Sequence, residues 1–373
     1  MPTAPTRYDV DRAALADLLA GEPRYRLDQV WTGLYAQLTD PADMTALPRS
    51  LRERLTAELP RALRGVTDAA TPDGDTVKRL WELDGGARIE TVLMHYRDRA
   101  TVCVSTQAGC AMACGFCATG QAGFERQLSV GEIVEQVVWA SRRAAARPRG
   151  AQRVSNVVFM GMGEPLANLD GVWGAVERIH GDLGLSARHL TISTVGLVPG
   201  IRRLAAASLP VNLAVSLHAA NDRLRDELVP VNRRYPLDAL AEACREHVVA
   251  TRRRLSLEWA LIDDVNDHAS DARELADFAR DLRAHVNLIP LNPTPGWPTR
   301  GTPPERVAAF ADHLRSLGVN ATVRQNRGTD IDAACGQLRA SHEIAVDPPR
   351  RRRTAATPHD LPDAPRGVSG PGR

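Results

Sequence analysis

Six short apolar segments, separated by segments with helical periodicity, constrain the fold of this 373-residue chain more than any other feature. The apolar segments are 101–106, 156–161, 189–194, 211–218, 255–262 and 285–292. Between them, stretches such as 130–146 and 237–251 place apolar residues three and four positions apart, as amphipathic helices do. This alternation predicts an α/β fold, either a parallel β/α barrel or an open doubly wound sheet. In both, the active site gathers at the carboxyl ends of the strands.

The rest of the chain divides around this region. Residues 1–70 show helical periodicity and predict a small helical accessory domain, which either caps the main domain or grips a substrate. The main domain is predicted over 75–345; it begins with a hairpin that turns at "DGG", and 304–326 closes its other side. Residues 346–373 are rich in Pro and Arg and are predicted to be disordered.

Composition restricts where the protein works and what it binds. The chain contains no run of eighteen apolar residues, and its first residues lack a signal-peptide pattern, so we expect a cytoplasmic protein without membrane contact. Its six cysteines are then reduced, and serve as ligands or catalysts. The net charge is +2, but the six arginines and two aspartates of 349–373 contribute +4, which leaves −2 for the remainder. Nucleic-acid binding would therefore depend on local patches.

Three cysteines lie within eight residues, in "GCAMACGFCATG", directly after the first predicted strand of the series. Cys110, Cys114 and Cys117 can reach one metal centre, but no fourth Cys or His lies in this loop. A [4Fe-4S] cluster held by three cysteines leaves one iron without a protein ligand, so a substrate can bind to that iron and react there. The alternative is a structural zinc site completed by a distant residue.

Polar residues follow several other strands. "GMGEPLANL" places a glycine and a carboxylate after the second strand, where the carboxylate could accept from an ammonium group. Each of the residues after the later strands, taken alone, is more typical of a turn than of a ligand site. Together they predict a polar ring suited to ribose hydroxyls, a carboxylate and an adenine edge. The predicted cofactor-binding residues are Gly163, Glu164, Ser193, Ser216, Leu217, His218 and Asn292.

Two further cysteines, Cys103 and Cys335, are candidates for a catalytic role. Cys103 lies in the first strand of the series, and Cys335 lies in "RGTDIDAACGQL", a loop after the last strand. Cys244 lies in a helical segment and is expected to be a small buried residue.

The cysteine spacing, with an aromatic residue before the last cysteine, resembles the signature of the radical S-adenosylmethionine (SAM) superfamily. The longer motifs "CVSTQAGCAMACGFCATGQAGFERQL", "GMGEPLANLD", "LAVSLHAANDRLRDELVPVNRRYP", "IPLNPTPG" and "RGTDIDAACGQL" resemble the RlmN type of rRNA/tRNA adenine-C2 methyltransferase. This resemblance, over about residues 8–342, implies a partial (β/α)6 radical-SAM barrel, a [4Fe-4S] cluster on Cys110, Cys114 and Cys117, and two SAM molecules per turnover.

The resemblance also implies a mechanism and its substrates. Cys335 would first accept a methyl group, which a radical from the second SAM would activate for addition to C2 of adenine. Cys103 would release the product by forming a transient disulfide with Cys335, and Glu90 matches the family's proton acceptor. The implied substrates are adenosine 2503 of 23S rRNA and adenosine 37 of certain tRNAs, with an electron donor such as flavodoxin. We expect a monomer.

Two other functions remain open from the sequence. A sister group of enzymes, with the same cysteines, methylates C8 of the same rRNA adenine, and a non-catalytic zinc-knuckle RNA-binding protein belongs to a different class. Three arginine groups are candidates for RNA phosphates, although charge runs are usually solvated. They are Arg142, Arg143, Arg147 and Arg149; Arg252, Arg253 and Arg254; and the run 350–353.

Overall fold

A ten-stranded mixed sheet is the main feature of the computed structural model, which describes residues 5–338 except 149, 295, 299 and 335. Its order is β1-β2-β3-β4-β7-β8-β9-β10-β11-β12, so β1 and β12 are the two edges and the barrel is open. The strands are β1 (Leu63–Ala70), β2 (Thr76–Leu83), β3 (Arg88–His95), β4 (Ala100–Cys103), β7 (Val154–Phe159), β8 (Leu190–Thr194), β9 (Asn212–Ser216), β10 (Ser256–Leu261), β11 (His285–Pro290) and β12 (Ala321–Val323).

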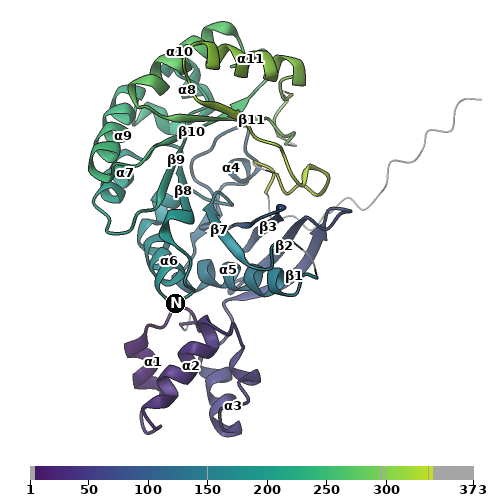
Figure 1. The fold of residues 1–373 in the computed structure, drawn as a ribbon, viewed down its shortest axis with the longest axis vertical. Helices are drawn as coiled ribbons and strands as arrows, with labels where there is room; N and C mark the ends of the chain where they lie inside the picture. Colours follow the sequence, from purple (N-terminus) through teal and green to yellow (C-terminus); the bar gives the residue numbers. More distant parts are fainter. Residues whose placement is uncertain (1–4, 149, 295, 299, 335, 339–373) are drawn as a thin grey trace, which may run out of the picture. The chain divides into compact units, whose positions relative to one another are not determined.

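From β4 to β12 every neighbouring pair is parallel, and helices connect most successive strands. Figure 1 shows α6, α7, α9 and α10 along the outer side of the curved sheet. The helices of this part are α4 (Ala118–Ala122), α5 (Val130–Ala145), α6 (Leu169–Gly181), α7 (Val198–Ala205), α8 (Asp222–Leu228), α9 (Leu237–Thr251), α10 (Ala269–Asp281) and α11 (Pro304–Ser316). The predicted partial barrel, with its six parallel strands, is confirmed; β12 adds a short seventh.

Alternation along β10 shows how the sheet separates its two faces. Leu257, Trp259 and Leu261 are fully buried, and the Trp259 ring stacks 6.3 Å from that of Phe310 on α11. The intervening residues point to the opposite face, because side chains alternate along a strand. The inner face lines the cavities described below. The apolar side chains on the outer face pack against the helices, and the side chains on the inner face are available for function.

The chain before the barrel is helical only in part. Helices α1 (Arg12–Leu18), α2 (Tyr25–Tyr35) and α3 (Arg49–Glu58) confirm the expected helical unit. The expectation of helix up to residue 70 is wrong for 63–70, which form β1 and pair antiparallel with β2. Pairing with the exposed edge of the β2–β3 hairpin satisfies backbone groups of this segment, which overrides its weak helical pattern.

Contacts with α5 and α6 fasten the N-terminal helical segment to the barrel. Trp31 Nε1 donates to Asp182 Oδ1 at 3.1 Å, and the amide of Gly131 donates to Asp9 Oδ1 at 2.6 Å. The amide of Ala62 donates to the buried carboxylate of Glu135 at 2.6 Å. The start of α5 is itself fixed by a capping box between Ser129 and Glu132.

Candidate active site

A two-stranded sheet frames the loop that carries the three clustered cysteines. β5 (Gln107–Gly109) pairs antiparallel with β6 (Phe124–Gln127), and the amide of Cys110 donates to the carbonyl of Gly123 at 2.7 Å. Gly109 has a φ of +72°, and a Cβ there would lie 1.9 Å from the Gly123 carbonyl oxygen, so the position requires glycine. The sequence predicts the loop but not this sheet, because such short strands have no readable period.

The environment of the thiols disfavours their free ionised form. Burial raises the pKa of Cys110 to about 12, and burial also raises the pKa of Cys114, with the neighbouring cysteines adding to both shifts. Thiolates are the form that binds metal. The loop therefore needs a positive centre to hold its cysteines ionised, as a metal cluster would provide.

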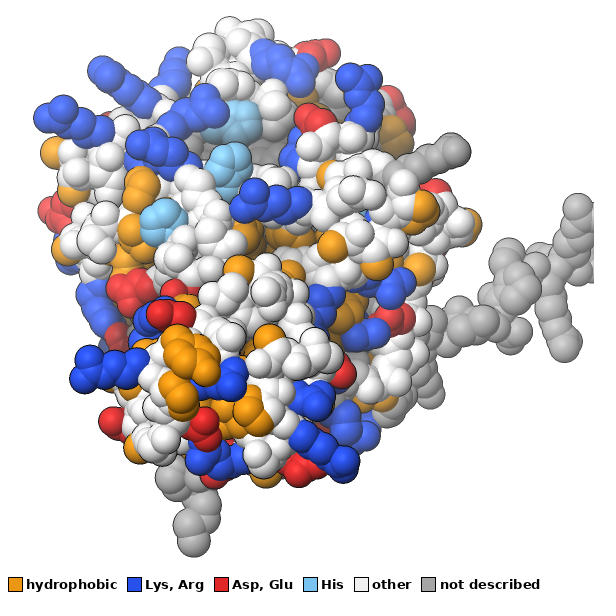
Figure 2. Space-filling view, turned by 60° about the horizontal axis from the view of Figure 1, so that its bottom comes forward, with side chains coloured by type: hydrophobic (Ala, Val, Ile, Leu, Met, Phe, Trp, Pro, Cys, Tyr) orange, Lys and Arg blue, Asp and Glu red, His pale blue; other side chains and the backbone are white. Residues whose placement is uncertain are grey.

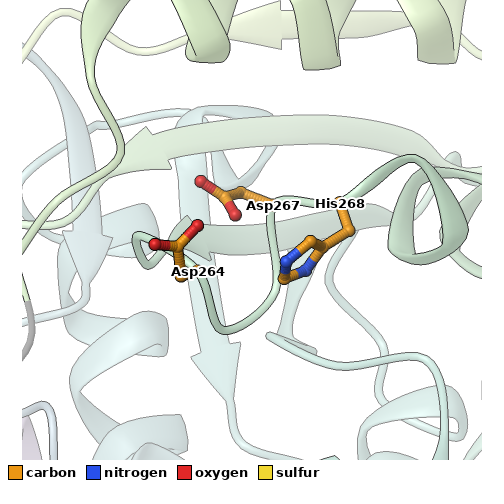
Figure 3. A group of neighbouring side chains, drawn as sticks. All are labelled: Asp264, Asp267 and His268. Carbon is orange, nitrogen blue, oxygen red and sulfur yellow. The ribbon is translucent and has the colours of Figure 1, made fainter.

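A further group of possible metal ligands lies outside the cysteine loop. Within the described residues, the one group of three possible ligands whose donor atoms all lie within 4.8 Å of one another is Asp264, Asp267 and His268 (Figure 3).

The group in Figure 3 is an ion-pair network. Arg306 lies 3.0 Å from Asp264 Oδ1 and 2.6 Å from Asp267 Oδ1, and the hydroxyl of Thr302 donates to Asp267 Oδ2 at 2.8 Å. The guanidinium already neutralises these carboxylates, so the group gives no support to a metal site.

An apolar cluster seats the cysteine loop against the barrel. Phe116 is buried, and its ring meets that of His218 edge to face at 4.8 Å. Cys114 packs in the same cluster with Leu224 and Ile262. Water is thereby kept from one side of the loop, which strengthens electrostatic interactions there.

Glu164 is fixed at the end of β7 by backbone donors. Its carboxylate accepts from the amides of Leu166 at 3.0 Å and Val195 at 2.9 Å, and its burial raises the pKa to about 7. A cationic ligand such as an ammonium group would favour the ionised form.

Gly163 lines the same cavity as Glu164 and the clustered cysteines, and its lack of a side chain also allows close packing. It has a φ of +100°, and a Cβ there would lie 2.5 Å from Cβ of Gln107, so the glycine is needed for packing on β5. The Gln107 side chain in turn accepts from the amide of Glu164 at 2.7 Å.

The structure brings most of the predicted polar ring into one cavity. Ser193, Ser216, His218 and Asn292 line it together with Glu164 and the three clustered cysteines. The two serine hydroxyl oxygens lie 3.5 Å apart, and the side-chain oxygen of Asn292 accepts from Asn326 at 2.7 Å. The four ring residues come from the ends of three strands, β8, β9 and β11; β8 and β9 pair directly, and the curvature of the sheet brings the end of β11 to the same cavity.

His218 is held as a neutral ring. Its Nδ1 accepts from the amide of Ala260 at 2.9 Å, and burial, assisted by Arg225, lowers its pKa to about 3. The neutral ring therefore carries its proton on Nε2.

Leu217 is the predicted ring member that the structure does not bring to the cavity. Its side chain is fully buried in the main hydrophobic core, its amide donates to the carbonyl of Glu258, and its carbonyl accepts from Arg225. The alternation of the strand directs it to the opposite face from Ser216.

The sequence did not single out Arg225 as a site residue. This fully buried side chain of α8 donates to the carbonyls of Leu217 at 3.1 Å and Val195 at 2.7 Å, and to Asn232 Oδ1 at 2.7 Å. It thereby joins the loops after β8 and β9. The sequence feature that could have indicated a buried role is that Arg225 shares a helix face with the apolar residues Leu224 and Leu228.

Cys103 lies beside the cluster loop. It is buried, and it lines a second cavity with Cys117, Ala334 and Gly336. Cys335 itself lies outside the described residues, but its two neighbours in the chain belong to this cavity. The amide of Ala118 donates to the carbonyl of Gly336 at 2.8 Å, which connects the segment after residue 335 to the end of the cluster loop.

Glu90 is a buried, ion-paired carboxylate and not a solvated residue of its strand. Lys78 Nζ lies 3.0 Å from Glu90 Oε1, and both side chains are almost inaccessible. Lys78 Nζ also donates to the carbonyl of Asp332 at 3.1 Å. One ammonium group thus connects Glu90 to the loop that leads to Cys335.

The two arginine groups that the structure describes differ in their partners. Arg142 pairs with Asp40 at 3.0 Å, Arg143 with Asp68 at 3.4 Å and Arg147 with Asp75 at 2.5 Å. These three have structural partners, while Arg149 and the run 350–353 lie outside the described residues. Arg252 and Arg254 are exposed, and neither has an ion pair within the part of the chain that the structure describes.

Comparisons with known proteins agree with this site. Residues 104–279 match the Radical SAM superfamily. The chain is 52% identical over 345 residues to the probable dual-specificity RNA methyltransferase RlmN of Salinispora tropica, covering 89% of this chain and 92% of that one. It is 51% identical to the protein of that name from Chloroflexus aurantiacus, over 91% of this chain and 94% of the relative. The chain belongs to the RlmN family.

A solved structure supports the same assignment. A radical SAM methyltransferase from Sphaerobacter thermophilus superposes with a TM-score of 0.87 at 50% identity, covering 90% of this chain and all of that one. The protein is thus a SAM-dependent methyltransferase of the radical class, which implies a [4Fe-4S] cluster and SAM. The described residues fit both groups: three thiols on one loop, of which Cys114 is buried and the other two are partly exposed, and the buried carboxylate of Glu164 at the same cavity.

Among the described residues, no helix is both long and apolar enough to cross a membrane.

Proposed function

We propose that this RlmN-family enzyme methylates C2 of adenine in RNA, at adenosine 2503 of 23S rRNA and adenosine 37 of certain tRNAs. The names of the relatives support an RNA substrate. The observation that carries the two-cysteine mechanism is the cavity shared by Cys103, Cys117 and the two neighbours of Cys335. A methyl-carrying Cys335 could meet both the cofactor side and Cys103 there.

The site residues would have two kinds of role: some would bind the cofactors, and others would transfer the methyl group and a proton. When bound, the cluster on Cys110, Cys114 and Cys117 and two SAM molecules per turnover would supply the methyl group and a hydrogen-abstracting radical. Glu164 would accept from the amino group of SAM, because a buried carboxylate with a raised pKa gains from a cationic partner. Ser193, Ser216, His218 and Asn292 would contact its other polar groups. Gly163 and Leu217 would act by shaping the backbone.

Two thiols and one carboxylate would complete the transfer. Cys335 would carry the methyl group as a thioether, and the methyl carbon would become bonded to C2 of adenine. Cys103 would then attack the Cys335 sulfur and release the methylated base, leaving a disulfide that a cellular thiol reduces. Glu90 would accept the C2 proton, with Lys78 holding its carboxylate in place.

We also propose a division of labour along the chain. Residues 1–70 would be an accessory domain that contacts RNA, and 75–345 would be the catalytic barrel. The contacts of Asp9 and Trp31 with the barrel support a fixed accessory segment. We propose that the enzyme is a cytoplasmic monomer that receives electrons from a donor such as flavodoxin. The tail 346–373 lies outside the described residues.

Nucleoside mass spectrometry tests the reaction. Anaerobically reconstituted protein, SAM and reductant are incubated with unmodified 23S rRNA and tRNA fragments, and 2-methyladenosine is the expected product. Detection of 8-methyladenosine instead would assign the enzyme to the sister group, and no methylation by cluster-loaded protein that cleaves SAM would refute the RNA assignment.

Matched cysteine variants test the mechanism. Cys335→Ala should abolish methylation, because the methyl carrier is lost. Cys103→Ala should accumulate a covalent protein–RNA adduct, because the releasing thiol is absent. Cys244→Ala, which changes a fully buried cysteine on α9, is the control and should retain methylation. Full methyl transfer by Cys335→Ala would refute the two-step mechanism.

A further inference from the structure

A cationic groove occupies the inner face of the barrel at the amino ends of its strands. Its volume is about 670 Å³, and its lining includes the first residues of β9, β10 and β11. The polar and charged residues that matter here are Asn212, Arg252, Arg253, Arg254, His285 and Arg324. Figure 2 shows Lys and Arg side chains gathered near histidines in the upper part of that view.

The groove holds excess positive charge. Arg252 and Arg254 are exposed and have no ion pair within the described ranges, and Arg253 donates to Asn212. At the rim, Arg99 lies 3.8 Å from Asp98. The carboxylate in the lining, Glu258, is buried and accepts from Asn287 at 2.7 Å and Ser256 at 2.9 Å.

Positively charged side chains in and beside the groove repel one another. Burial and the Coulomb field of Arg254 lower the pKa of His285, and burial and the field of Arg188 lower the pKa of Arg253. Both shifts have burial as their largest cause, but the second cause in each is a neighbouring arginine. An anion in the groove would relieve this repulsion.

The groove and the active-site cavities share lining residues. Met160, Glu258 and Arg324 line both the groove and the cavity of the clustered cysteines. Met94 and Tyr96 line both the groove and the cavity of Cys103. Along β10, Ser256 faces the groove and Ala260 faces the cysteine cavity, a separation of about 13 Å at the rise of a strand. A chain of nucleotides in the groove could therefore reach the active-site cavity within a few residues of RNA.

We propose that this groove binds the phosphates of the single-stranded RNA that flanks the target adenine, through Arg252 and Arg254. The inference rests on the proposed RNA substrate and assigns its path. A base that reaches a buried cavity must leave its stack, so the nucleotides beside it are locally single-stranded. Arginine is suited to phosphate because its planar donors bind two oxygens together. The arginines at 142, 143 and 147 are already paired with carboxylates, which makes them weaker candidates.

Salt-dependent RNA binding tests the proposal. The full-length, cluster-loaded protein and an Arg252→Ala/Arg254→Ala variant are titrated with a fluorescent single-stranded fragment that contains the target adenosine. Each lost phosphate contact reduces the slope of log affinity against log salt by about 0.7 for single strands, so the variant should lose about 1.4. Its KM for RNA should rise at least tenfold at low salt. Unfolding midpoints verify that both proteins are folded.

The matched control removes two exposed arginines that do have partners. Arg202→Ala/Arg245→Ala alters the pairs with Glu246 at 2.7 Å and Asp281 at 3.1 Å on the outer helices, and RNA binding should remain that of the unaltered protein. An unchanged slope in the groove variant, or an equal loss in the control, would overturn the groove assignment while the RNA function stands. Failure of the unaltered protein to bind or methylate any RNA would instead refute the proposed function.

Discussion

The two ends of the barrel hold their polar side chains in opposite ways. At the carboxyl ends of the strands, Glu164, His218 and Arg225 are buried and hydrogen-bonded to the backbone. At the amino ends, Arg252 and Arg254 are exposed, without ion pairs in the described part of the chain. The first arrangement fixes geometry, as preorganised catalysis requires. The second leaves charge free for a partner that arrives from solution.

The largest expected effect comes from removing a cluster ligand. Cys114→Ala should abolish methylation and the iron–sulfur absorption of reconstituted protein, because the remaining two thiols cannot hold the cluster. Cys244→Ala, equally buried but on α9, should retain the absorption. Visible absorption and iron content are the measurements. An intact spectrum from Cys114→Ala would show that this cysteine is not a ligand.

The next effect contrasts a buried with an exposed arginine. Arg225→Met should lower the free energy of unfolding by about 3–5 kcal/mol, because it removes the guanidinium donors of the Val195 carbonyl and of the buried Asn232 Oδ1. Arg254→Met should change it by no more than about 0.5 kcal/mol. Urea denaturation measures both. Similar losses in the two variants would remove the distinction between the two ends of the barrel.

The smallest expected effect is on the pH dependence of stability and concerns Glu258, whose carboxylate lines both the cysteine cavity and the arginine groove. Burial raises its pKa, so the folded protein retains this proton to higher pH than the unfolded chain does. Its contribution to stability is therefore greatest at low pH and falls as pH rises above the ordinary carboxyl range.

Glu258→Gln should flatten that decline, as measured by unfolding at a series of pH values. Glu246→Gln, whose exposed carboxylate has a lowered pKa beside Arg202, should not flatten it. A decline that persists in Glu258→Gln would assign the pH dependence to other groups.

Local patterns made much of this site predictable. The cysteine loop, Glu164 and the serines follow strands whose alternation with helices is visible in the sequence, and parallel strands bring their carboxyl ends together. Leu217 shows the limit of such placement, because one step along a strand turns a side chain to the other face. β1 was missed because pairing with β2, which no local pattern encodes, decided its structure.

The sequence by itself determined the fold class, the family and the three-cysteine motif, since all depend on spacing along the chain. Tertiary structure alone decided which charges are free. Arg142 pairs with an aspartate 102 residues away, and Arg147 with one 72 residues away, whereas Arg252 and Arg254 face a groove. Lys78 likewise meets Glu90 and Asp332 through the hairpin and the closing loop. The physical reason is that charge pairing depends on distance in space, which a run of arginines in the sequence does not contain.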